Sequence, residues 1–164
     1  MEMDIFFQYE KSDVLQALRF HFMQRREIQI FRGILMALGL FGLLVFSLHL
    51  IGSSLLLALL LMLALLAVVF WFVLPLAIYA KSKTFQDTIR LALNSEGLLI
   101  RTQYSERHLS WMGILMVIET KDFILLYRDK KSFFLVPARA FKDSKQRVEF
   151  SSLLQSHIRD YRSQ

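Results

Sequence analysis

The chain has 164 residues, of which 55% are apolar, and its formal net charge is +6. Soluble domains are usually about 45–50% apolar, and the excess here lies in one block, residues 33–80, which contains no Asp, Glu, Lys or Arg. A soluble domain of this size cannot bury such a block, and the absence of cysteine excludes disulfides, thiolate nucleophiles and Cys-based metal sites.

The N-terminal region, residues 1–32, precedes this block. The aromatic, partly alternating segment Met3–Tyr9 predicts a strand. Ser12 is a plausible N-cap, with Asp13 in the first turn of a helix that we expect to continue directly into the apolar block. The first residues are acidic and the apolar run starts late, so we expect no cleaved signal peptide.

Residues 33–80 predict a transmembrane hairpin. One helix of this length would be about twice as long as the hydrocarbon core of a bilayer, which is about 30 Å thick. The only cluster of polar and small residues in the block is His49–Ser54, which predicts the turn. The two spans are then expected at about residues 31–48 and 55–79, and Pro75 is expected to kink the second.

Basic residues predict the orientation of the hairpin. Arg25, Arg26 and Arg32 flank the first span, and Lys81 and Lys83 flank the second. The turn between the spans has no basic residue. Lys and Arg accumulate on the cytoplasmic side of membrane proteins, so both termini are expected in the cytoplasm.

Small residues in the first span suggest close helix packing. They are Gly33, Ala37, Gly39 and Gly42. Such residues allow two helices to approach closely. We favour packing against the second span of the same chain over the alternative, a contact between two copies in a homo-oligomer.

In residues 81–164 the apolar residues occur in short, alternating runs, which are typical of strands. Turn residues separate six predicted strands, at residues 85–93, 98–103, 107–111, 115–119, 123–127 and 132–136. Asp143 with Gln146 predicts the cap of an amphipathic helix that continues to about Ile158. The expected fold class is therefore membrane α+β: a helical hairpin and a cytoplasmic antiparallel sheet or partial barrel that a C-terminal helix closes.

Several segments carry a resemblance to a family. They are Ser110-Trp111-x-x-Ile114-x-x-Val117-x-Glu119, the run 123–127, Phe133-x-x-x-Pro137-x-Arg139-x-Phe141, and Phe150-x-x-Leu153-Leu154. With the preceding strand and hairpin, the chain resembles the YcxB-like bacterial membrane proteins. The resemblance implies a multi-pass protein of the bacterial inner membrane with a pleckstrin-homology-like (PH-like) C-terminal domain, and it implies no catalytic residues.

Residue patterns typical of catalysis and metal binding are sparse. The four histidines are isolated from one another, and no phosphate loop or nucleophile elbow is present. His108 and Ser110 share a strand face with Glu106, but strands often contain such a pair by chance. We therefore expect no enzyme activity, no cofactor and no metal.

Charge suggests the function. Residues 81–164 carry 15 basic and nine acidic residues, which is the whole excess. Beside a membrane, an anionic lipid surface explains this better than nucleic acid does. We expect an interaction domain for a protein partner or anionic lipids, although topology and solubility alone would also explain the charge. The candidate binding residues are Arg25, Arg26, Arg32, Lys81, Lys83 and a basic turn of Arg128, Lys130 and Lys131. The alternative is an immunity protein whose hairpin protects against a membrane-acting toxin.

Overall fold

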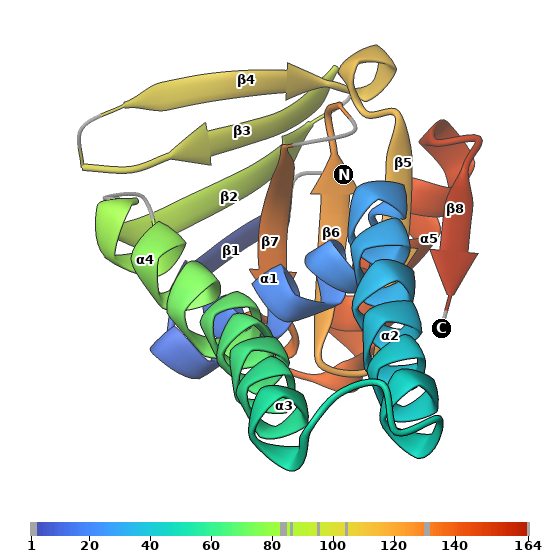
Figure 1. The fold of residues 1–164 in the computed structure, drawn as a ribbon. Helices are drawn as coiled ribbons and strands as arrows, with labels where there is room; N and C mark the ends of the chain where they lie inside the picture. The colour runs from blue at the N-terminus through green and yellow to red at the C-terminus, as the bar shows by residue number, and fades with distance from the viewer. Residues whose placement is uncertain are drawn as a thin grey trace. The chain divides into compact units, whose positions relative to one another are not determined.

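The computed structural model describes residues 3–82, 85, 87–94, 96–103, 105–129 and 132–163. The chain divides into two compact units. Figure 1 labels their helices and strands and colours the ribbon by residue number. The first combines Met1–Ala17 with Ser82–Gln164 and is called the β unit; the second is Leu18–Lys81. The N-terminal region is thus shared between the two units and does not form a separate segment that ends at residue 32.

The first sheet of the β unit joins the two ends of the chain. It consists of β1 (Met3–Gln8), β2 (Thr88–Asn94), β3 (Gly97–Arg101) and β4 (Glu106–Ser110), antiparallel and in that order. The pairing of β1 with β2 runs from Met3 opposite Leu93 to Gln8 opposite Thr88. Alternate residues of β1 are buried, including Ile5 and Phe7, so this strand contributes one face to the core. The whole second unit is therefore inserted between two paired strands.

The second sheet follows in the sequence. Its strands are β5 (Met116–Glu119), β6 (Phe123–Tyr127), β7 (Phe133–Pro137) and β8 (Tyr161–Ser163), in the order β7-β6-β5-β8. All five residues of β6 are buried, as expected for a continuous apolar run in a central strand. Short 3₁₀ turns occur at Trp111–Gly113 and Ala138–Ala140.

Helix α5 (Ser144–His157) follows the second sheet. The Asp143 side chain accepts a hydrogen bond from the Gln146 N–H at 2.7 Å, and the Gln146 side chain accepts one from the Lys142 N–H at 2.7 Å. The predicted cap is therefore confirmed. Phe150 and Leu154 are fully buried, so one face of α5 belongs to the core of the β unit.

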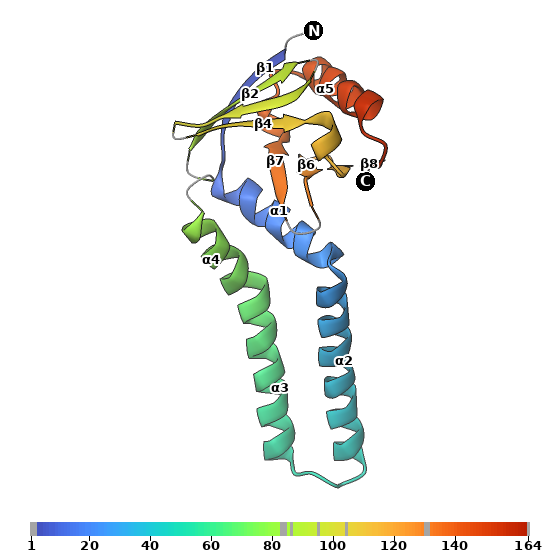
Figure 2. The ribbon, with the colours of Figure 1, turned by 90° about the horizontal axis from the view of Figure 1, so that it is seen from above.

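The second unit contains the end of α1 (Lys11–Gln24) and three further helical stretches. They are α2 (Arg26–Ser47), α3 (Ser53–Val68) and α4 (Leu74–Lys81), with a π-helical turn, η1 (Val69–Val73), between the last two. α2 and the continuous helix of α3, η1 and α4 are each long and apolar enough to cross a membrane. Figure 2 shows them running antiparallel on either side of a turn at residues 48–52, which confirms the predicted position of the turn.

Two details at α1 correct the sequence prediction. The helix starts at Lys11, the Glu10 carbonyl accepts the Val14 N–H, and the Asp13 carboxylate accepts the Glu10 N–H at 3.3 Å. Ser12 therefore lies inside the helix and is not its cap. The helix also does not continue into the first apolar helix, because the backbone at Arg25 is extended (φ −71°, ψ 129°).

The π-helical turn ends two residues before Pro75. Proline has no N–H, so the carbonyl four residues earlier, at Trp71, cannot accept the usual α-helical hydrogen bond. Wider hydrogen-bonding turns commonly occur where a helix accommodates such a defect. The helical pattern changes over Val69–Val73, close to Pro75, and the kink expected there stays a prediction.

Packing between the two long helices follows one line of residues on α2. Phe31 contacts Phe70 with ring centroids 5.7 Å apart. Farther along, a Cβ placed on Gly39 would lie 3.7 Å from Leu63, and one on Gly42 only 2.4 Å from Leu59. Gly33 has nothing within 4 Å of such an atom, and Ala37 is exposed. Gly39 and Gly42 therefore lie on the helix–helix contact, and Gly33 and Ala37 lie outside it.

We expect Gly42→Leu to destabilise the hairpin, because a larger side chain would collide with Leu59 and separate the helices. Overpacking of this kind costs about 1–3 kcal/mol. The measurement is the thermal unfolding midpoint of the full chain in detergent. Gly33→Leu is the matched control and should leave the midpoint unchanged; equal effects of the two variants would contradict the packing described here.

Candidate membrane-surface site

Several arginines of the β unit are neutralised by carboxylates. Arg139 binds Asp13 at 2.7 Å and Glu10 at 3.4 Å, and it donates to the Gln8 carbonyl at 2.6 Å. It therefore holds the segment where β1 passes into α1. Three more ion pairs are Arg90–Asp4, Arg101–Glu106 and Arg162–Asp160. These arginines have structural partners and contribute less to a free basic surface.

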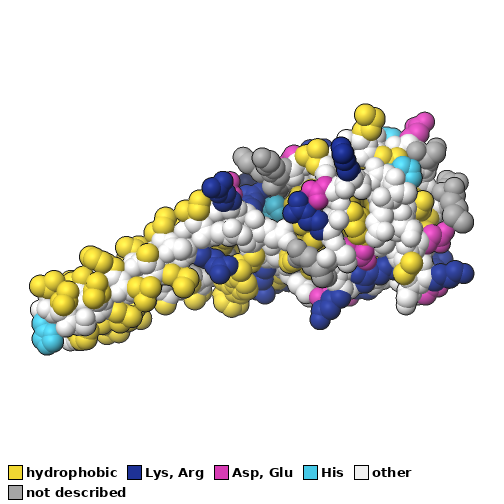
Figure 3. Space-filling view, turned by 90° about the vertical axis from the view of Figure 1, so that its right-hand side faces the viewer, with side chains coloured by type: hydrophobic (Ala, Val, Ile, Leu, Met, Phe, Trp, Pro, Cys, Tyr) yellow, Lys and Arg dark blue, Asp and Glu magenta, His cyan; other side chains and the backbone are white. Residues whose placement is uncertain are grey.

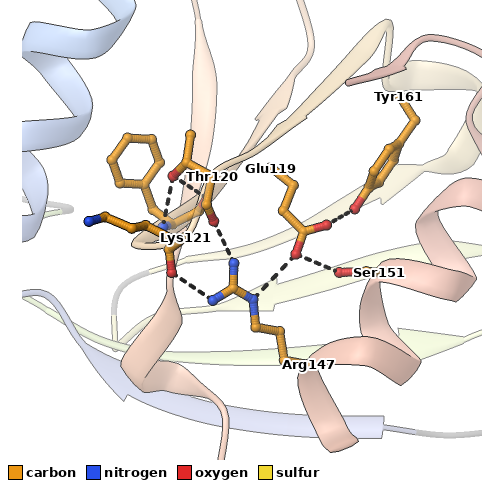
Figure 4. Close-up of polar contacts among 7 residues, drawn as sticks. Glu119, Thr120, Lys121, Arg147, Ser151 and Tyr161 are labelled. Atoms are coloured by element: carbon orange, nitrogen blue, oxygen red, sulfur yellow. Dashed lines mark hydrogen bonds and ion pairs between the residues drawn. The ribbon is translucent and has the colours of Figure 1, made fainter. Parts of the chain in front are cut away.

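A larger polar cluster surrounds Glu119 at the end of β5 (Figure 4). Its carboxylate accepts hydrogen bonds from Arg147 at 3.3 Å, from Ser151 at 3.1 Å and from the Tyr161 hydroxyl. Arg147 also donates to the carbonyls of Lys121, at 2.7 Å, and of Thr120. Burial and then the hydrogen bond to Glu119 raise the pKa of Tyr161, so its hydroxyl keeps the proton that it donates. The cluster connects α5, β8 and the turn between β5 and β6.

The predicted basic residues of the hairpin lie at one end of it. Arg26 and Lys81 are exposed, at the start of α2 and the end of α4, opposite the turn at residues 48–52. Arg32 lies one to two turns into α2, where its guanidinium is 3.4 Å from the Met23 sulfur. Figure 3 shows hydrophobic side chains along the hairpin, with Lys and Arg at its base. Lys83 lies outside the described residues.

Arg25 has a specific partner in the break between α1 and α2. Its Nε donates to Nε2 of His21 at 3.0 Å. Burial first, and then the charge of Arg25, lower the pKa of His21 to about 4. The imidazole is therefore neutral near pH 7, which lets Nε2 accept this hydrogen bond.

Sequence reasoning missed Arg19. Its guanidinium lies over the rings of Trp71, at 5.7 Å from the centroid, and of Phe72, at 5.4 Å. Its Nε is buried and has no hydrogen-bond partner among the described residues. A cation held on aromatic rings in this way stabilises the contact between α1 and the π-helical turn. Nothing in the spacing of Arg19 along the sequence indicates this contact, because it joins positions about fifty residues apart.

The basic turn after β6 adjoins a cavity in the β unit. The cavity has a volume of about 260 Å³. Arg128 lines it, together with Arg107 and His108 of β4. Lys130 and Lys131 lie outside the described residues. Arg107 was not predicted as a candidate. The antiparallel pairing of β3 with β4 places it opposite Ile100, another residue of the cavity lining.

Of the groups considered for catalysis, His108 lines this cavity, whereas Glu106 has another partner. Glu106, the carboxylate nearest to His108 along β4, is bound by Arg101 through two hydrogen bonds of 2.8 and 3.2 Å. Among the described residues, no group of three or more His, Cys, Asp or Glu side chains is placed to hold a metal ion.

The fold and its surface define a class of protein: an antiparallel β unit with a C-terminal helix, and two helices long and apolar enough to cross a membrane. Residues 93–154 match the family model described as YcxB-like protein, which confirms the resemblance for this part of the chain. The matched segment begins in β2 and ends in α5. No curated protein and no solved structure matches the chain significantly.

We expect Arg147→Ala to destabilise the β unit by about 1–3 kcal/mol, because it removes the cationic partner of the half-buried Glu119 carboxylate and the donor to two carbonyls. Lys145→Ala, on an exposed position of the same helix, is the control and should change stability by less than about 0.5 kcal/mol. Denaturant unfolding of the full chain in detergent measures both. Equal stability of the two variants would show that the cluster contributes little.

Proposed function

We propose that this chain is a non-enzymatic membrane protein that presents a PH-like domain to an anionic lipid surface. The observation that carries the proposal is the exposure of the hairpin. Only 6% of the most apolar stretch of α2 is buried, and none of that of the second long helix. Soluble proteins rarely expose apolar patches above a few hundred Å². A bilayer would cover this surface, and helices satisfy their backbone hydrogen bonds there.

Strand pairing supports the placement of both hairpin ends on one side of the membrane. β1 precedes the hairpin, β2 follows it, and six residue pairs join them. Paired strands must fold in one compartment. The basic residues at the hairpin base favour the cytoplasm, and the bacterial inner membrane is the location that the YcxB-like resemblance implies.

The arrangement of strands supports a PH-like domain. Four antiparallel strands, β1 to β4, are followed by three more, β5 to β7, and by one C-terminal helix. In this interpretation the hairpin replaces the first strand connection of the domain. β8 is then an addition after the helix, paired in parallel with β5.

Charge at the hairpin base favours lipid over a protein as the partner. Arg26, Arg32 and Lys81 have no carboxylate partner in the described part of the chain. Each basic residue near an anionic membrane contributes about 1 kcal/mol of attraction. Because the hairpin fixes these residues at the membrane boundary, the attraction requires no separate association step.

The orientation is tested by fusing green fluorescent protein or alkaline phosphatase to either end of the chain in a bacterial host. Green fluorescent protein fluoresces when it stays in the cytoplasm, and alkaline phosphatase is active only after export. We expect fluorescence and no phosphatase activity at both ends. Phosphatase activity at either end would overturn the proposed orientation, and activity at one end only would exclude the hairpin.

Lipid selectivity is tested with the full chain in bilayers that contain spin-labelled phosphatidylglycerol or phosphatidylcholine. We expect phosphatidylglycerol to be preferred at the protein, and the triple variant R26Q/R32Q/K81Q to reduce this preference at least threefold. High salt should act in the same direction, because screening weakens the attraction. The control K142Q/K145Q/R159Q removes the same charge from exposed positions on or near α5.

Equal loss in the two triple variants would contradict a site at the hairpin base. Unchanged lipid selectivity, together with a stoichiometric protein that co-purifies only with the unaltered base, would assign the surface to a protein partner. Protection of cells that depends on the turn at residues 49–54, and not on the base, would favour the immunity function.

A further inference from the structure

The cavity of the β unit is partly open to solvent, with exposed residues such as Arg107 and Arg128 in its lining. At about 260 Å³, this cavity has the volume of roughly nine waters, each with a share of ~30 Å³. It lies between the two sheets, because Ile100 and Leu109 line it from β3 and β4, and Leu126 and Leu135 from β6 and β7.

Most of the cavity wall is apolar. Besides the four aliphatic residues, aromatic rings line it at Tyr9, Phe85, Phe133 and Phe134. The Tyr9 hydroxyl already donates its proton to the Leu135 carbonyl at 2.6 Å, and burial raises its pKa, so it does not donate a hydrogen bond to a ligand. A wall of this kind favours a hydrocarbon occupant over a free sugar or phosphate.

Two exposed arginines give the same cavity a cationic part. Arg107 and Arg128 both line it, and neither side chain has an ion pair within the described residues. The neighbouring carboxylates have other partners: Glu106 binds Arg101, and Asp129 accepts the Ser132 N–H at 2.8 Å. An anionic group could therefore be held here by two guanidinium groups, with hydroxyls of Thr102 and Ser105 nearby.

We propose that this cavity binds part of the acyl chain of an anionic single-chain lipid, with its carboxylate or phosphate at Arg107 and Arg128. The lipid would come from the bilayer, so the inference rests on the proposed function. Tyr9 and Ser82 also line the cavity, and they are the residues near which the chain leaves the β unit for the hairpin and returns from it. Residues that precede and follow the hairpin in the sequence therefore both contribute to the cavity wall.

The test uses the full chain in nanodiscs of neutral phosphatidylcholine. The probes are palmitate and 1-palmitoyl lysophosphatidic acid, each with a photoreactive diazirine in the acyl chain, and adducts are mapped by mass spectrometry. We expect adducts on cavity residues such as Leu126, Phe133 and Phe134. The probe that labels more strongly identifies the head group as a carboxylate or a phosphate.

The variant R107Q/R128Q should reduce cavity labelling at least fivefold. The control K145Q/R159Q removes the same charge from exposed positions outside the cavity lining and should retain labelling within twofold. Thermal unfolding of both variants checks that they remain folded. Adducts confined to residues 26–81 in the unaltered protein, or equal loss in the two double variants, would overturn the proposal.

Failure of this inference is separable from failure of the proposed function. Preference for phosphatidylglycerol that depends on Arg26, Arg32 and Lys81, without cavity adducts, would leave the membrane-surface function intact and remove the lipid from the cavity. Cavity adducts without any such preference would leave the cavity site and remove the surface function.

Discussion

The pairing of β1 with β2 is the constraint on which the rest of the structure depends. Six residue pairs close a connection of about 80 residues. For a flexible chain, closing a loop of that length costs about 4 kcal/mol beyond a constant. The antiparallel contact of the two long helices reduces this cost, because Phe31 against Phe70 and Gly42 against Leu59 already bring the two ends of the connection to the same end of the hairpin.

Several arginines of the β unit have structural partners. The half-buried Arg147 and the exposed Arg139 are both held by carboxylates and carbonyls, and the need for such partners is greatest at Arg147, which is more removed from water. Exposed basic residues at the hairpin base and beside the cavity lack such partners in the described chain.

Much of the architecture was predictable because its physical signals are local. The apolar block and His49–Ser54 predicted the long helices and their turn, β6 was predicted with its observed bounds, and Asp143 with Gln146 predicted the cap of α5. β8 was missed because three residues are too few to show periodicity and its partner is distant in sequence. The break at Arg25 was missed because apolar residues recur at roughly helical spacing on both sides of the polar run 24–27.

The candidate sites were less predictable, since they depend on contacts between distant segments. Arg128 was selected from its basic neighbours in the sequence, whereas Arg107 became a candidate only when strand pairing placed it beside the same cavity. For the small residues of the first span, too, the sequence alone did not predict which ones make contact with a distant segment. Gly33, Ala37, Gly39 and Gly42 are equivalent by composition, yet only Gly39 and Gly42 lie against the second helix.

Insertion of a hairpin between paired strands also affects how the domain can form. β1 is synthesised first but cannot pair with β2 until β2 is made, so its apolar face stays unburied until then. In a membrane, the spans form before the later strands exist, because each helix satisfies its own backbone hydrogen bonds in lipid. The hairpin would then hold β1 close to the position that β2 later takes. In this way one segment would serve both as the membrane anchor and as the device that closes the first sheet.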